Sequence, residues 1–115
     1  MAYTAYIIGE VPNVITIKCR QHFNNAQLLL ERMGFNVVNP IKNLENTRIK
    51  KEDAVKRNVR LFTDCNIAYV LSTLSFENVK NAELLLAIKL NMIIMQEPIV
   101  LVEEEAFEES NVLQD

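Results

Sequence analysis

The sequence predicts an α/β domain built on a mostly parallel sheet. Along residues 3–95, short apolar runs of strand length alternate with longer segments of helical periodicity, and this alternation is typical of β-α-β units. The run at 66–72 is apolar almost throughout, as expected of a parallel strand covered on both faces. A chain of 115 residues, half of them hydrophobic, is long enough for one core. We expect one domain over 1–102 and an acidic tail over 103–115.

The first half of the chain is predicted to contain two strands and one helix. Residues 3–9 form the first strand, and residues 20–35 form a helix that Gly34 stops. Apolar residues spaced by three and four predict the face of this helix that packs on the sheet: Phe23, Ala26, Leu29, Leu30 and Met33. Residues 36–40 are a short second strand, closed by a proline. A polar loop over 41–51 follows.

The second half repeats the alternation. A helix is expected at 52–64, a strand at 66–72, a helix at 77–90 and a strand at 92–95. Residues 99–102 could add a fifth strand. The inward face of the helix at 52–64 is predicted to be Val55, Val59 and Phe62.

Right-handed crossovers between these strands give the sheet order 2-1-3-4, with the possible fifth strand at the far edge. This is the order of a flavodoxin-like three-layer sandwich. The chain reverses direction between the first and third strands, and open α/β sheets bind ligands outside the carboxyl ends of their strands at such a point. The loops after Ile8 and Leu71 should therefore flank a pocket.

The charge is unevenly distributed. The net charge is −3, although the last thirteen residues hold six acidic side chains and no basic one. Basic residues are concentrated between Lys42 and Arg60, where either a solvated helix face or a phosphate-bearing ligand would explain them. Aromatic residues do not interleave with this basic segment, which makes nucleic acid an unlikely partner.

Signals for export, membrane insertion and metal binding are lacking in the sequence. No secretory signal pattern opens the chain, and no apolar run reaches the length of a membrane span. Cys19 and Cys65 lack the spacing of a disulfide framework or zinc site, so we expect reduced thiols and a cytoplasmic protein. His22 is the one histidine and is expected on the surface. No companion side chain has ligand spacing, so a metal site is not predicted.

One carboxylate, Glu83, interrupts the apolar run NAELLLAIKLNM at 81–92. A carboxylate that faces a core costs several kcal/mol unless it is paired, hydrogen-bonded or protonated. The apolar residues that share its helical stripe, Val79, Ala82, Leu86 and Leu90, predict that it borders the core. Tyr6, near the carboxyl end of the first strand, should reach the same crevice. A solvated carboxylate and an ordinary core tyrosine are the alternatives.

Four segments together resemble the nucleoside 2-deoxyribosyltransferase-like superfamily, over most of residues 3–95. They are YIIG (6–9), FNNAQLLLERMGFNVVNP (23–40), KRNVRLFTDCNIAYVL (56–71) and AELLLAIKLNM (82–92). The positions in register with the family pattern are Tyr6, Phe23, Ala26, Gly34, Asn39, Pro40, Cys65 and Glu83.

The resemblance implies a retaining reaction on the N-glycosidic bond of a nucleoside or nucleotide, without a cofactor. Glu83 would attack C1′ of the sugar and form a covalent glycosyl-enzyme, while Tyr6 positions it by a hydrogen bond. The substrate-binding candidates are Gly9, Asn13, Asn58 and Lys80. Family members commonly complete their pocket with a neighbouring subunit, so a homo-oligomer is also implied.

Several positions differ from the family pattern. Asn58 and Asn66 stand where relatives have aspartates, and an amide cannot act as a general acid for the leaving base. Glu77, Val79 and Lys80 stand where relatives have a small glycine-containing turn, although Lys80 could contact a phosphate through its charge. A catalytically degenerate module that binds a nucleotide or serves assembly is therefore the alternative function.

Overall fold

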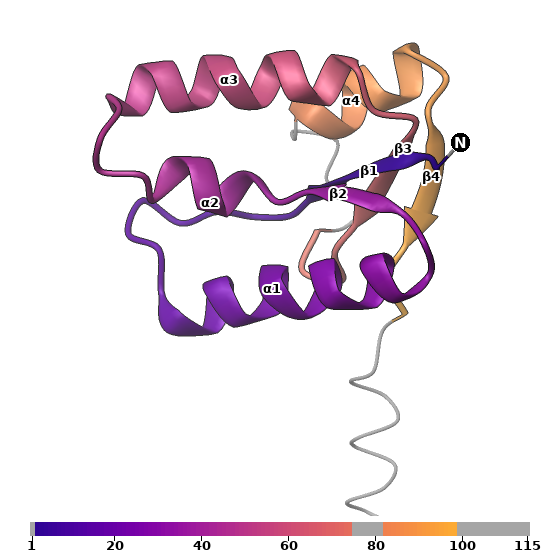
Figure 1. The fold of residues 1–115 in the computed structure, drawn as a ribbon, viewed down its shortest axis with the longest axis horizontal. Helices are drawn as coiled ribbons and strands as arrows, with labels where there is room; N and C mark the ends of the chain where they lie inside the picture. The colour runs from indigo at the N-terminus through magenta and orange to yellow at the C-terminus, as the bar shows by residue number, and fades with distance from the viewer. Residues whose placement is uncertain (1, 75–81, 99–115) are drawn as a thin grey trace, which may run out of the picture.

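The computed structural model describes residues 2–74 and 82–98. Its four strands are β1 (Thr4–Ile8), β2 (Asn36–Val38), β3 (Ile67–Val70) and β4 (Ile93–Gln96). All neighbouring strands pair in parallel, in the order β2-β1-β3-β4 (Figure 1). The predicted α/β fold and sheet order are confirmed. The possible fifth strand at 99–102 and the tail at 103–115 lie outside the described residues.

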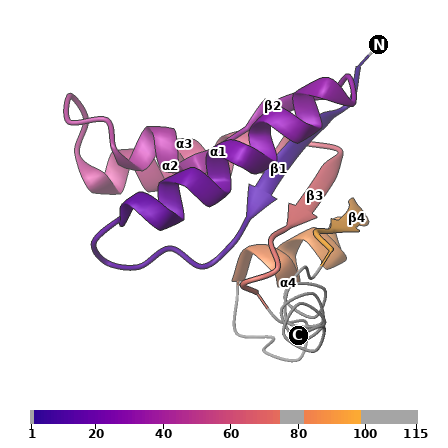
Figure 2. The same ribbon diagram turned by 90° about the horizontal axis from the view of Figure 1, so that it is seen from below.

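Helices cover both faces of this sheet. They are α1 (Ile17–Arg32), α2 (Pro40–Leu44), α3 (Lys51–Thr63) and α4 (Ala82–Lys89). Figure 1 shows α1 on one side of the sheet and α3 and α4 on the other. Seen from the side of α1, this helix lies over β1 and β2, and β3 and β4 lie beside it (Figure 2). The described residues thus form three layers.

The central strand β1 supplies both halves of the core, because side chains alternate between the faces of a strand. Ala5 and Ile7 belong to a buried cluster with residues of α1, and Tyr6 and Ile8 belong to a second cluster on the side of α3 and α4. The larger partners in the second cluster are Phe62 and Leu84. Four of the five β1 residues are fully buried, and Thr4 is the exception.

The predicted inward face of α3 is wrong. Val55 and Val59 are 46% and 48% exposed, whereas Ala54, Asn58 and Phe62 are buried. The buried line has the same spacing of four residues but starts one position earlier. A prediction from hydrophobicity does not find this line because Asn58 is polar. An amide can nevertheless be buried when its hydrogen bonds are made inside the protein.

The predicted faces of the other two long helices need smaller corrections. In α1, Phe23, Ala26 and Leu30 are buried, but Leu29 and Met33 are 45% and 50% exposed. One helix contacts a sheet along a line narrower than its apolar stripe, so the flanking residues stay in solvent.

The inward face of α4 is centred on Leu84 and Ala87 rather than on the predicted stripe. Ala82 and Leu90 are exposed, and Leu86 is half-buried. Glu83 lies beside this inward line, and Val79 falls outside the described residues.

A short helix, α2, occupies part of the segment predicted as a loop. Asn39 caps it, because its Oδ1 accepts a hydrogen bond of 3.1 Å from the backbone N–H of Ile41, and Pro40 stands in the first turn. An Asn-Pro pair is a recognised helix start, since asparagine favours the N-cap and proline the first turn. The second strand therefore ends at Val38 and not at Pro40.

Candidate functional site

Tyr6 and Glu83 are in direct contact. The hydroxyl of Tyr6 donates a hydrogen bond of 2.7 Å to Oε2 of Glu83, across 77 residues of sequence. Tyr6 is fully buried on β1, and Glu83 is partly buried in the first turn of α4. The ring of Phe62 meets that of Tyr6 edge to face, with centroids 4.9 Å apart. The packing of α4 against the sheet thus brings together the two residues proposed as catalytic from the sequence.

Burial dominates the electrostatics of this pair. Desolvation, and then the charge of Glu83, raise the pKa of Tyr6 far above its ordinary value, so the phenol stays protonated and acts as a donor. Burial also raises the pKa of Glu83, and the hydrogen bond from Tyr6 offsets part of this effect. Within residues 2–74 and 82–98, the hydrogen bond to the Glu83 carboxylate is the one from Tyr6 to Oε2. A poorly solvated carboxylate oriented in this way is suited to a nucleophilic role.

The raised pKa of Glu83 predicts a dependence of stability on pH. The ordinary pKa of about 4.3 holds in the unfolded chain, so above that value the native state binds more protons than the unfolded state. The Glu83 contribution to the free energy of unfolding is therefore complete below the unfolded pKa and is lost as pH rises through the folded pKa. Glu83→Gln should remove this loss in urea unfolding between pH 4 and 8. Wild-type and variant curves that stay parallel would contradict the shift.

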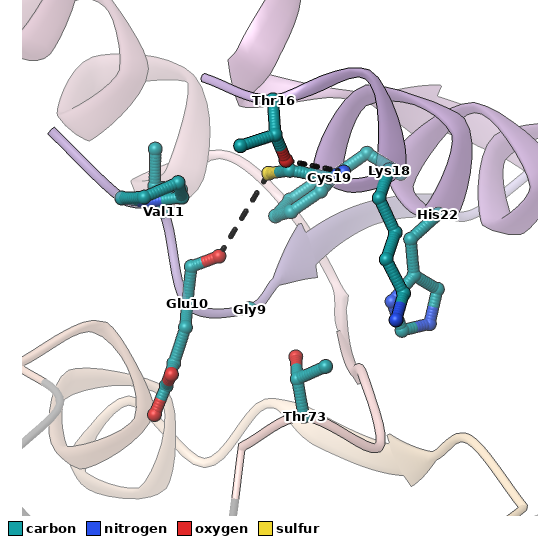
Figure 3. Close-up of a pocket in the computed structure, with 10 residues that line it drawn as sticks. Gly9, Glu10, Val11, Thr16, Lys18, Cys19, His22 and Thr73 are labelled. Carbon is teal, nitrogen blue, oxygen red and sulfur yellow. Dashed lines mark hydrogen bonds between the residues drawn. The ribbon is translucent and has the colours of Figure 1, made fainter. Parts of the chain in front are cut away.

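A cavity of about 590 Å³ opens at the carboxyl ends of β1 and β3, where the topology predicts a pocket (Figure 3). It is lined by the loop after β1, the first turns of α1 and Thr73. Figure 3 shows Lys18 and His22 on one side of α1, and the sulfur of Cys19 on the other side, near Val11.

The Tyr6–Glu83 pair does not line this cavity. The reason is that side chains alternate along β1. Tyr6 faces α3 and α4, whereas its neighbours Ala5 and Ile7 face α1. Gly9 lies at the boundary and lines the cavity. A Cβ at Gly9 would stand 2.7 Å from Cδ1 of Leu71 and 3.0 Å from Cζ of Phe23. A side chain at Gly9 would therefore displace the side chain of Leu71.

The remaining predicted binding residues that the structure describes, Asn13 and Asn58, are not gathered around the pair. Asn13 lines a separate cavity of about 530 Å³, together with residues of α2 and α3. Lys80 lies outside the described residues. Asn66 is exposed, and its Oδ1 accepts a hydrogen bond of 3.0 Å from the backbone N–H of Thr4, so it joins the starts of β1 and β3.

Asn58 is buried and makes its hydrogen bonds within the protein. Its Oδ1 accepts from Nδ2 of Asn43 at 2.7 Å, and its Nδ2 donates to the carbonyl of Pro40 at 3.2 Å. Both ends of the amide therefore join α2 to α3. This arrangement gives Asn58 a structural role in the described residues, one turn before the ring that packs on Tyr6.

Asn58→Asp should lower the free energy of unfolding by about 1–3 kcal/mol at pH 7. An ionised carboxylate cannot donate to the carbonyl of Pro40, so this hydrogen bond would be lost and a negative charge would face the carbonyl oxygen. Urea unfolding measures the loss, and Asn25→Asp, an exposed change on α1, is the control. If Asn58→Asp is as stable as wild type, the amide is not needed to join α2 and α3.

One contact was missed by the sequence analysis. Nε2 of His22 lies 2.6 Å from Oε1 of Glu97, and the same oxygen accepts a hydrogen bond of 2.9 Å from the backbone N–H of Ser72. His22 is largely withdrawn from solvent rather than free on the surface, with 28% of its side chain exposed. The partners are 75 residues apart, and no local pattern marks such a pair.

The described residues contain no group of three or more metal-ligating side chains. Both cysteines are free thiols, and burial raises the pKa of Cys65 to about 11. Among the helices of residues 2–74 and 82–98, none is long and apolar enough to cross a membrane.

Comparison of the chain with protein family models, with curated proteins and with solved structures gave no match.

Proposed function

We propose that this protein acts on the N-glycosidic bond of a deoxynucleoside or its 5′-monophosphate, with Glu83 as the nucleophile. The observation that carries the proposal is the 2.7 Å hydrogen bond from the buried phenol of Tyr6 to the partly buried carboxylate of Glu83. It fixes one carboxylate oxygen of a desolvated nucleophile. The substrate class comes from the sequence resemblance.

In the proposed reaction, an oxygen of Glu83 attacks C1′ of the sugar. The bond between C1′ and the base nitrogen breaks, and its electron pair leaves with the base, which takes up a proton from solvent. Water or a second base then attacks C1′, the bond from C1′ to the oxygen of Glu83 breaks to release the carboxylate, and the attacking group gives up its proton to solvent. Two inversions at C1′ give overall retention. Tyr6 holds the carboxylate in one orientation through both steps.

The test is to incubate the protein with deoxynucleosides and their 5′-monophosphates and to measure free base by chromatography. A 2-fluoro sugar analogue slows release of the covalent intermediate, because fluorine destabilises positive charge at C1′. We expect mass spectrometry to find the sugar attached to the peptide that contains Glu83. Base release without any such adduct, or an adduct on another residue, would contradict the nucleophile assignment.

One observation favours the alternative, a nucleotide-binding module without catalysis. Asn58 stands where a general acid is expected from the resemblance, and its amide is engaged with Asn43 and Pro40. Saturable binding of a nucleotide in calorimetry, with no base release from any substrate of the panel, would establish this alternative.

A further inference from the structure

Glu97 connects three parts of the fold at the carboxyl end of the sheet. Its backbone N–H donates a hydrogen bond of 2.8 Å to the carbonyl of Val70, which extends the pairing of β4 with β3. Its Oε1 accepts from the backbone N–H of Ser72 at 2.9 Å and contacts Nε2 of His22 at 2.6 Å. The carboxylate therefore joins α1, the end of β4 and the start of the turn after β3.

The surroundings keep Glu97 ionised. Burial raises its pKa, but the hydrogen bonds from Ser72 and His22 outweigh this effect and leave the pKa below its ordinary value. Burial, and then the charge of Glu97, raise the pKa of Tyr69, so this hydroxyl is uncharged. Lys18 is the charged neighbour of His22 on α1, one turn earlier (Figure 3).

The turn that Glu97 holds reaches the Tyr6–Glu83 pair through packing. The backbone N–H of Leu74 donates to the carbonyl of Leu71 at 3.0 Å, which closes the turn around Ser72. The side chain of Leu74 is only 4% exposed and belongs to the buried cluster of Tyr6 and Leu84. Displacement of Ser72 would therefore move the side chain of Leu74, which belongs to the same buried cluster as Tyr6 and Leu84. Leu84 directly follows Glu83 in α4.

We propose that Glu97 is a positioning residue for the Tyr6–Glu83 pair and that it acts by accepting the hydrogen bond from the backbone N–H of Ser72. The contact with Nε2 of His22 holds the same carboxylate oxygen against α1, so the turn after β3 keeps a fixed place at the end of the sheet.

The effect on catalysis rests on the proposed function, but the positioning itself is tested without substrate. Amide hydrogen exchange of Ser72 reports the hold, and the ¹³C titration of the Glu83 carboxyl by NMR reports the site. Glu97→Ala should speed exchange at Ser72 roughly tenfold or more and should shift the Glu83 titration. Glu97→Gln, which retains an acceptor oxygen, should restore part of both. Glu45→Ala is the matched control, because it removes the contact of Arg20 between α1 and α2 instead.

An unchanged Ser72 exchange in Glu97→Ala would overturn the hold, and faster exchange with an unchanged Glu83 titration would overturn the positioning role. If wild type releases no base, the proposed function fails while these NMR results still decide the positioning.

Discussion

Glu83→Gln should lower the rate of base release by about 10⁴-fold or more, because an amide cannot displace a base from C1′. The variant is close to isosteric and keeps an oxygen that accepts the hydrogen bond from Tyr6, so the fold should be retained. Single-turnover release of base, followed by chromatography at pH 7, measures the effect. Residual release within tenfold of wild type would show that another group performs the chemistry.

Tyr6→Phe separates the positioning role from the nucleophile. Loss of one donor to a reacting oxygen typically costs about 10²-fold in rate, so this variant should fall between wild type and Glu83→Gln. The hydrogen bond from Tyr6 lowers the pKa of Glu83, so its removal should raise that pKa further. The lower limb of the pH–rate profile should move to higher pH in Tyr6→Phe, whereas a general loss of folded protein would leave the limb in place.

The largest expected effect on stability belongs to Phe62→Ala, which should lower the free energy of unfolding by about 3–5 kcal/mol. The ring of Phe62 is 1% exposed and packs edge to face on Tyr6, so truncation leaves a cavity beside the buried phenol. Urea unfolding at pH 7 measures the loss. Val59→Ala, at a position 48% exposed on the same helix, is the matched control and should cost less than about 0.5–1 kcal/mol.

This pair of variants also separates the two descriptions of α3. If the face predicted from hydrophobicity were the buried one, Val59→Ala would be destabilised by an amount typical of core valines. Equal and large losses in both variants would therefore contradict the buried line of Ala54, Asn58 and Phe62.

The sequence predicted the sheet order well, because each strand is a short apolar run and right-handed crossovers leave few arrangements. The meeting of Tyr6 and Glu83 followed from this order together with the apolar stripe that placed Glu83 at the border of the core. The helix faces were predicted less well, since valine and leucine also occur in solvent and hydrophobicity alone does not mark a buried amide such as Asn58. The contact of His22 with Glu97 joins α1 to the segment after β4. Hydrophobic periodicity predicts the faces of helices and strands and does not predict a polar contact of this kind.

The alternation of β1 has a consequence for how this protein can change. Tyr6 serves one face of the sheet and the residues on either side of it serve the other, so substitutions on one face leave the opposite cluster intact. An insertion or deletion within β1 has the reverse effect, because a shift of one residue exchanges the faces of every side chain beyond it. Point substitutions can thus change either side of this protein independently. A change in the length of the five-residue strand β1 alters both sides at once.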